Sequence, residues 1–172
     1  MKRTNMTYIF CLDNNRQFCD DLRKRFSDQA KYSFFSLSSP EDILRESAGI
    51  RKRRTSKVVL ISINGSNLQL PEVESFTRDL KKADPYTGLI IVHTAERTEE
   101  IKKSIVFNID AYIQKNGNAI PRVHNAVRKL ISEHILRLAR KRLRTALFAT
   151  VAFLIFTGIF FLLASLLSPG NY

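Results

Sequence analysis

Continuous apolar runs alternate with amphipathic segments along most of the chain. A run in which every residue is apolar, rather than every second one, is typical of a strand buried on both faces of a parallel sheet. Largely apolar runs lie at Tyr8–Leu12, Val58–Ile63, Leu89–Thr94 and Ala111–Gln114, and Lys31–Leu37 is a further strand-like stretch. The pattern therefore predicts five strands of a parallel sheet.

Each of these runs is followed by a segment with the hydrophobic spacing or the cap residues of a helix. The predicted helices cover Arg16–Ser27, a segment opened by Ser38–Asp42, Pro71–Lys82, about Thr98–Phe107, and a long stretch from Pro121. Strands that alternate with helices and are buried on both faces indicate an α/β domain with helices on either side of the sheet. No internal repeat or low-complexity segment interrupts this order.

The C-terminal pattern is different, because Thr145–Leu167 contains no charged residue, no Asn or Gln and no Pro. At about 1.5 Å per residue this helix would be roughly 34 Å long, enough to cross a hydrocarbon layer of about 30 Å. We therefore expect a transmembrane helix. The predicted organisation is a globular domain at 1–132, a basic juxtamembrane stalk at 133–144, the transmembrane helix at 145–167 and a short extracytoplasmic tail at 168–172.

Charge is concentrated in two clusters, although the net charge of the whole chain is +12. The first cluster consists of Arg51, Lys52, Arg53 and Arg54. The second lies within residues 121–144, which carry eight Lys or Arg and the single acid Glu133. The basic residues of this second cluster that stand directly before the apolar segment are Arg137, Arg140, Lys141, Arg142 and Arg144. Because no charged residue follows that segment, the positive-inside bias predicts a tail-anchored, single-pass protein of the cytoplasmic (inner) membrane with its N-terminal domain in the cytoplasm.

In a doubly wound sheet, the loop before the third strand and the end of the last helix both lie at the amino-terminal edge. Both basic clusters are therefore expected to face the membrane and to attract anionic lipid. For the cluster at 51–54, an ordinary solvated loop is an equally good interpretation. The stalk offers a surface for a possible homodimer, although it is too short to predict a coiled coil.

Cysteine and histidine indicate no metal site. Cys11 and Cys19 fall in a predicted strand and in the helix after it, so buried reduced thiols are expected, with a redox role as the less favoured alternative. His93, His124 and His134 lack the spacing of metal ligands. We expect neither a metal nor another cofactor.

Two strand-end motifs resemble those of the response-regulator receiver domain. The motifs are I-I-V-H-T-A-E at Ile90–Glu96 and D-A-Y-I-Q-K at Asp110–Lys115. The resemblance covers about residues 7–132 and implies a flavodoxin-like, doubly wound five-stranded parallel sheet with strand order 2-1-3-4-5. It also implies that Thr94 and Tyr112 match the switch residues and that Lys115 matches the family's lysine.

The acidic residues of that family are mostly missing. Its phosphoacceptor aspartate falls on Ser62, followed here by Ile63 and Asn64, and its acidic pair falls on Asp13 and Asn14. Mg²⁺ is held mainly through carboxylate oxygens, and an acyl phosphate cannot form on serine. The sequence thus predicts a degenerate pseudo-receiver without catalytic residues.

Three functions are compatible with these features. The first is a non-enzymatic, membrane-tethered signalling adaptor that presents the surface around Thr94 and Tyr112 to a cytoplasmic signalling protein. The second is a phosphorelay component that still senses a phosphoryl group or Mg²⁺ at the degenerate site. The third, nucleic-acid binding through the basic clusters, is disfavoured because no aromatic residues are interleaved with the charges.

Overall fold

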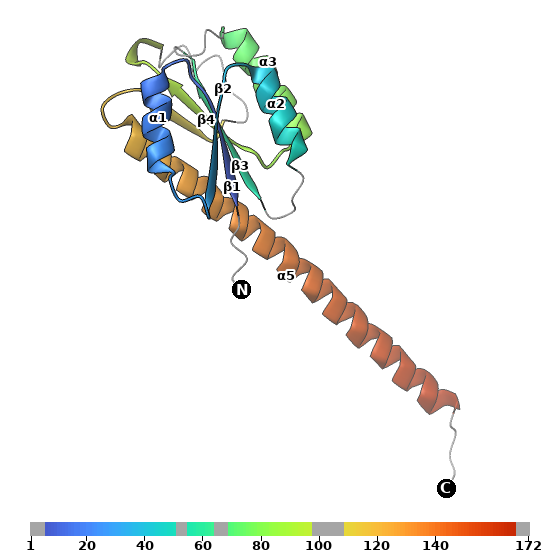
Figure 1. Cartoon of the computed structure of the whole chain (residues 1–172). Coiled ribbons are helices and arrows are strands. Elements are labelled where there is room, and N and C mark those ends of the chain that lie inside the picture. The colour runs from blue at the N-terminus through green and yellow to red at the C-terminus, as the bar shows by residue number, and fades with distance from the viewer. Residues whose placement is uncertain (1–5, 51–54, 64–68, 98–108, 168–172) are drawn as a thin grey trace. The chain divides into compact units, whose positions relative to one another are not determined.

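The computed structural model describes residues 6–50, 55–63, 69–97 and 109–167 (Figure 1). The chain divides into two compact units, Met1–Ser132 and Glu133–Tyr172. We describe each unit by itself.

The first unit is built on a five-stranded sheet in the order β2-β1-β3-β4-β5. Every neighbouring pair of strands is parallel. The strands are β1 (Thr7–Leu12), β2 (Tyr32–Leu37), β3 (Ser56–Ser62), β4 (Gly88–His93) and β5 (Ala111–Gln114). The predicted fold, a doubly wound flavodoxin-like sheet, is confirmed.

The helices begin where the sequence offers cap residues. The side chain of Asn15 accepts a hydrogen bond from the Phe18 amide and caps α1, and Ser39 caps α2 in the same way through the Asp42 amide. Such caps satisfy amide groups that have no partner inside the helix. The elements are α1 (Arg16–Arg25), α2 (Pro40–Gly49), α3 (Leu70–Ala83), the short 3₁₀ helix η1 (Ala95–Arg97) and α5 (Ala119–Leu167). The helix predicted at about Thr98–Phe107 lies outside the described residues.

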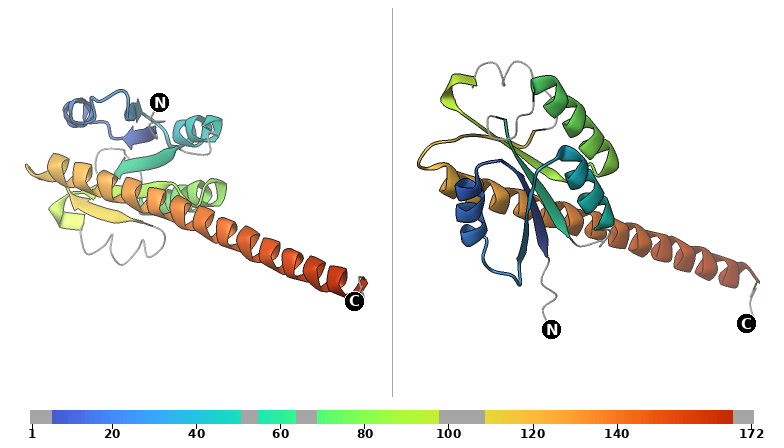
Figure 2. Two further views of the ribbon diagram at one scale, coloured as in Figure 1. Left: turned by 90° about the horizontal axis from the view of Figure 1, so that it is seen from below. Right: turned by 45° about the horizontal axis from the view of Figure 1, so that its top comes forward.

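Helices cover both faces of the sheet (Figures 1 and 2). On one face, α1 and the first turns of α5 pack through Leu22, Val123 and Val127 against a core that includes Ile9 and Leu60. On the other face, α2 and α3 close a second core. Gly88 permits close packing on the first face, because an added Cβ would lie 2.8 Å from the Leu130 side chain of α5.

Burial differs from the sequence prediction at the edges of the sheet. The central strands β3 and β4 are buried as expected, but five of the six residues of β2 are half-buried and Ser36 is exposed. β5 is also mostly half-buried. A strand at the edge of a sheet has a neighbour on one side only, so its apolar sequence does not secure complete burial.

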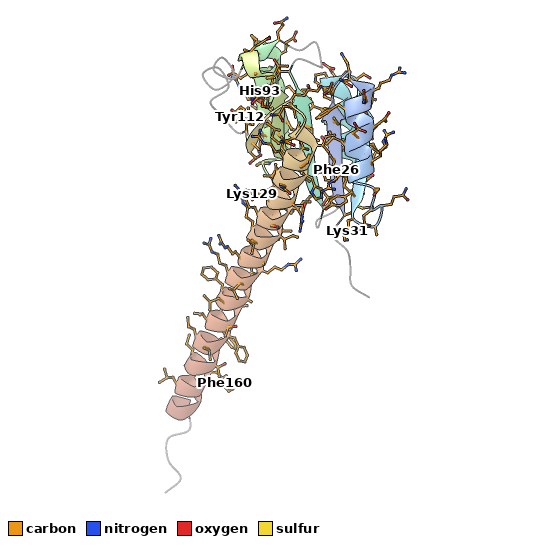
Figure 3. The ribbon with its side chains drawn as sticks, turned by 90° about the vertical axis from the view of Figure 1, so that its left-hand side faces the viewer. Phe26, Lys31, His93, Tyr112, Lys129 and Phe160 are labelled. Carbon is orange, nitrogen blue, oxygen red and sulfur yellow. The ribbon has the colours of Figure 1, made fainter. Side chains whose placement is uncertain are left out.

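The second unit continues α5 as an uninterrupted helix to Leu167. One helix among the described residues is long and apolar enough to cross a membrane, and it is this one. Large apolar side chains project from it, among them Phe160 (Figure 3), and Phe148 and Phe156 are 75% and 70% exposed. Thr145, Thr150 and Thr157 each donate their hydroxyl hydrogen bond to the carbonyl four residues earlier. These bonds satisfy polar groups within the helix, as an apolar environment requires.

Candidate functional site

The strand register brings the predicted site residues to one edge of the sheet. Leu12 pairs with Ile61, so Asp13 follows β1 beside Ser62, the last residue of β3. His93 pairs with Gln114, which places Lys115 beside the end of β4. In an α/β sheet the carboxyl ends of the strands are where binding sites usually form.

An ion pair between Asp13 and Lys115 occupies this edge. Lys115 Nζ lies 2.5 Å from Asp13 Oδ2, and the Asp13 side chain is fully buried while that of Lys115 is 21% exposed. The backbone amide of Asn15 donates to the other carboxylate oxygen at 2.8 Å. Both oxygens of this carboxylate therefore have a partner inside the protein.

Two further contacts hold the lysine in place. Its backbone amide donates to the His93 carbonyl at 2.6 Å, and its ammonium lies 4.5 Å from the centre of the Phe18 ring. A cation over an aromatic face is attracted by the negative face of the ring. The position of Lys115 is thus set jointly by β4, β5 and α1.

Ser62 carries a buried polar group at this edge that lacks a hydrogen-bond partner within the described ranges. It is 2% exposed, and its hydroxyl has no hydrogen-bond partner among the residues that the structure describes. A buried hydroxyl without a partner costs about 1–3 kcal/mol of folding free energy. Such an atom is a candidate contact for a ligand or a modification.

Oxygen donors for Mg²⁺ are few at this edge. Among the residues predicted for the site, Asp13 alone carries a carboxylate, and the Lys115 ammonium already neutralises its charge. Asn14 is exposed, and Asn64 lies outside the described residues. No group of three His, Cys, Asp or Glu residues able to hold a metal occurs in the described ranges. Because Mg²⁺ requires oxygen ligands of high charge density, this donor set fits the ion poorly.

The two predicted switch residues lie on neighbouring strands, Thr94 just after the end of β4 and Tyr112 within β5. Thr94 directly follows β4 and is half-buried, and its carbonyl oxygen lies 2.8 Å from Nδ1 of the buried His93. Tyr112 packs at the margin of the core under α2 and α3, the face opposite to that of Ile113. Burial raises the pKa of the Tyr112 hydroxyl. Figure 3 labels His93 and Tyr112.

The structure describes one of the two basic clusters but not the other. Arg51, Lys52, Arg53 and Arg54 lie outside the described residues, so their predicted membrane-facing position stays a prediction. The five residues of the second cluster all lie on α5 with exposed side chains: Arg137, Arg140, Lys141, Arg142 and Arg144.

Sequence reasoning did not predict the contact between the two cysteines. Cys11 and Cys19 are buried and reduced, as expected, but their sulfur atoms lie only 3.7 Å apart. The hydrophobic pattern placed Cys11 in a strand and Cys19 in the next helix. Only the orientation of α1 on the sheet decides that the two side chains meet.

Comparisons with known proteins support the fold. No family profile matches the sequence, and no curated protein matches it. Among solved structures, a response regulator receiver domain protein from Clostridium thermocellum matches with a TM-score of 0.61 at 16% identity, over 76% of this chain and 98% of that one.

Two other receiver structures give similar values. The signal receiver domain of an HD domain-containing protein from Pseudomonas fluorescens matches with a TM-score of 0.58 at 13% identity, over 81% of this chain and 96% of that one. The receiver domain of a sensor histidine kinase from Pseudomonas aeruginosa, solved with a magnesium ion in its active-site cleft, matches with a TM-score of 0.53 at 12% identity, over 75% and 99% of the two chains. The first unit therefore has the flavodoxin-like fold of receiver domains.

Proposed function

We propose that this protein is a membrane-tethered pseudo-receiver that acts in signalling as a protein-interaction module and not as a phosphotransfer enzyme. The observation that carries the proposal is the Asp13–Lys115 pair. In this pair the one remaining carboxylate of the site is buried and bonded to the ammonium group and to the Asn15 amide. A receiver that accepts a phosphoryl group needs free carboxylates for Mg²⁺ beside the phosphoacceptor, and none of the described residues predicted for this site offers one.

The proposed partner is a cytoplasmic signalling protein that binds near Thr94 and Tyr112. Thr94 lies at the end of β4, and Tyr112 is a half-buried aromatic residue on the edge strand β5. Partly exposed aromatic side chains are favourable anchors for protein partners. The fold shared with receiver domains supports the same surface.

The proposed membrane attachment rests on the second unit. Its apolar side chains are exposed along the helix, which is unfavourable in water and favourable in lipid. The exposed residues Arg137–Arg144 stand next to this apolar stretch and provide attraction to anionic headgroups of about 1 kcal/mol per basic residue near the surface.

An NMR titration of the full-length, ¹⁵N-labelled chain in detergent micelles tests the loss of phosphotransfer chemistry. Mg²⁺ is added first and beryllofluoride, a phosphoryl mimic, second. We expect the amide signals of Asp13, Ser62, Thr94 and Lys115 to stay in place. The matched control is the double variant Asn14→Asp/Ser62→Asp, which restores the missing carboxylates and is expected to respond to Mg²⁺. A wild-type response clustered at these four residues would refute the non-catalytic proposal.

Such a response would favour the second candidate function, a sensor of phosphoryl groups. One observation supports this candidate, namely the buried Ser62 hydroxyl, which has no partner within the described residues and lies next in register to Asp13. Wild-type shifts abolished by Ser62→Ala would establish it.

Membrane insertion is tested separately. The full chain should sediment with membranes and resist alkaline carbonate extraction. Replacing Phe153 and Leu154 by Arg costs about 2.5–3.5 kcal/mol per residue at the centre of a membrane-spanning helix and should release the protein into the soluble fraction. As a control, Phe153→Leu/Leu154→Phe keeps the helix apolar and should stay in the membrane. Release of the wild-type protein by carbonate would refute the anchor.

A further inference from the structure

The first unit contains a pair of thiols in contact. Cys11 on β1 and Cys19 on α1 are the two cysteines of the whole chain, and their sulfur atoms lie 3.7 Å apart. Both residues are buried, with exposed fractions of 1% and 4%. No other thiol of the same chain can compete for either of them.

The fold places this pair next to Asp13, one partner of the Asp13–Lys115 ion pair. Cys11 belongs to the core that α1 covers, and Asp13 directly follows the last residue of β1. Cys19 Sγ donates a hydrogen bond to the Asp13 carbonyl at 3.4 Å, and its neighbour Phe18 carries the ring under the Lys115 ammonium. The thiols and the candidate site therefore share both β1 and the first turns of α1.

The two thiols are chemically different. The hydrogen bond with Cys11 lowers the pKa of Cys19 to about 7. A hydrogen bond with Ser36 and, to a smaller extent, the positive charge of Lys115 act in the same direction, whereas desolvation and the Asp13 charge oppose them. The pKa of Cys11 is raised well above its usual value, first by its hydrogen bond with Cys19 and then by burial. Cys19 is also the more exposed of the two thiols, at 4% against 1% for Cys11, so we take Cys19 as the nucleophile of the pair.

We propose that Cys11 and Cys19 form an oxidation site, at which a small hydroperoxide converts the two thiols into one intramolecular disulfide between β1 and α1. This inference is independent of the proposed signalling function.

The reaction balances in two steps. The Cys19 thiolate attacks the terminal oxygen of the hydroperoxide, the O–O bond breaks, and the leaving alkoxide or hydroxide takes up a proton to give an alcohol or water. The product is a sulfenic acid on Cys19. The Cys11 sulfur then attacks the Cys19 sulfur, the S–O bond breaks, and water leaves with the proton from Cys11. Overall, two thiols are oxidised and one hydroperoxide is reduced.

The geometry favours this intramolecular bond over other products. The sulfur atoms, now 3.7 Å apart, must approach by roughly 1.6 Å to reach the roughly 2.05 Å of a disulfide. Burial of both sulfurs excludes bulky thiols and disulfides, so the small hydroperoxide is the suitable oxidant and glutathione disulfide is not.

Intact-mass spectrometry of the full chain in detergent micelles tests the proposal. The protein is treated with hydrogen peroxide, quenched with acid and alkylated. We expect a mass loss of about 2 Da, no alkylation and no disulfide-linked dimer. Glutathione disulfide at the same concentration should give at least tenfold less product in the same time.

Two variants identify the roles of the thiols. Cys11→Ala leaves Cys19 without a resolving partner, so a gain of about 16 Da or a dimedone adduct is expected. Cys19→Ala leaves only Cys11, which is 1% exposed and has no second thiol to pair with, so no mass loss of about 2 Da is expected. Wild-type protein that stays fully alkylatable after peroxide treatment, or that forms only dimers or over-oxidised thiols, would overturn the proposal. So would a mass loss of about 2 Da in either single variant.

Discussion

The two ends of the sheet carry the same kind of ion pair in different surroundings. Near the amino ends of the strands, Lys57 pairs with Asp84 at 3.0 Å and Lys81 pairs with Asp110 at 3.1 Å. At the carboxyl ends, Lys115 pairs with Asp13. The aspartates of the first two pairs are about 30% exposed, whereas that of the third is fully buried.

This comparison shows how the candidate site differs from an ordinary structural contact. The Asp110 carboxylate also accepts the Leu89 amide, so it fastens the start of β4 next to β5. Asp13 uses its second oxygen in the same way, on the Asn15 amide. Both ends therefore use a lysine and a backbone amide to neutralise an aspartate. The pair at the carboxyl end differs because its aspartate, Asp13, is completely buried and because the hydroxyl of Ser62 lies next to it without a partner among the described residues.

The largest expected effect comes from breaking the buried pair. Lys115→Met leaves Asp13 charged and buried, and removal of one partner of a buried pair typically costs about 3–5 kcal/mol. Urea unfolding of the full chain in micelles, followed by near-UV circular dichroism, measures the loss. The double variant Asp13→Asn/Lys115→Met removes both charges and should recover most of it. Equal stability of the two variants would mean that the pair is not effectively buried.

A smaller effect is expected at the amino end. Lys81→Met removes the ammonium from Asp110, but this carboxylate keeps the Leu89 amide and contact with water. We therefore expect a loss of about 1 kcal/mol or less in the same unfolding measurement. A loss as large as that of Lys115→Met would remove the distinction between the two ends.

The smallest expected effect has the opposite sign. Ser62→Ala removes a buried hydroxyl that has no partner among the described residues, so stability should rise by up to about 1 kcal/mol. The matched control is Ser47→Ala, at a buried serine whose hydroxyl donates to the Leu44 carbonyl at 3.1 Å, where stability should fall. A fall for Ser62→Ala would show that this hydroxyl is bonded in solution.

Local sequence determined the elements and their order. Continuous apolar runs predicted the strands, and Asn15 and Ser39 cap their helices as their positions suggested. The apolar, charge-free C-terminus predicted the long exposed helix. These features depend on hydrogen bonds and side chains within a few residues of each other, which is why they could be predicted from one sequence.

Tertiary structure alone decided which distant side chains meet. Asp13 and Lys115 are 102 positions apart, and their contact depends on the register of four neighbouring strands. The packing of α1 on β1 brings Cys19 to Cys11, and the edge position of β2 leaves its apolar residues half-buried. Sequence pattern predicts which residues are buried, because burial follows local periodicity. Contacts depend on how whole elements pack, and so they belong to the folded domain.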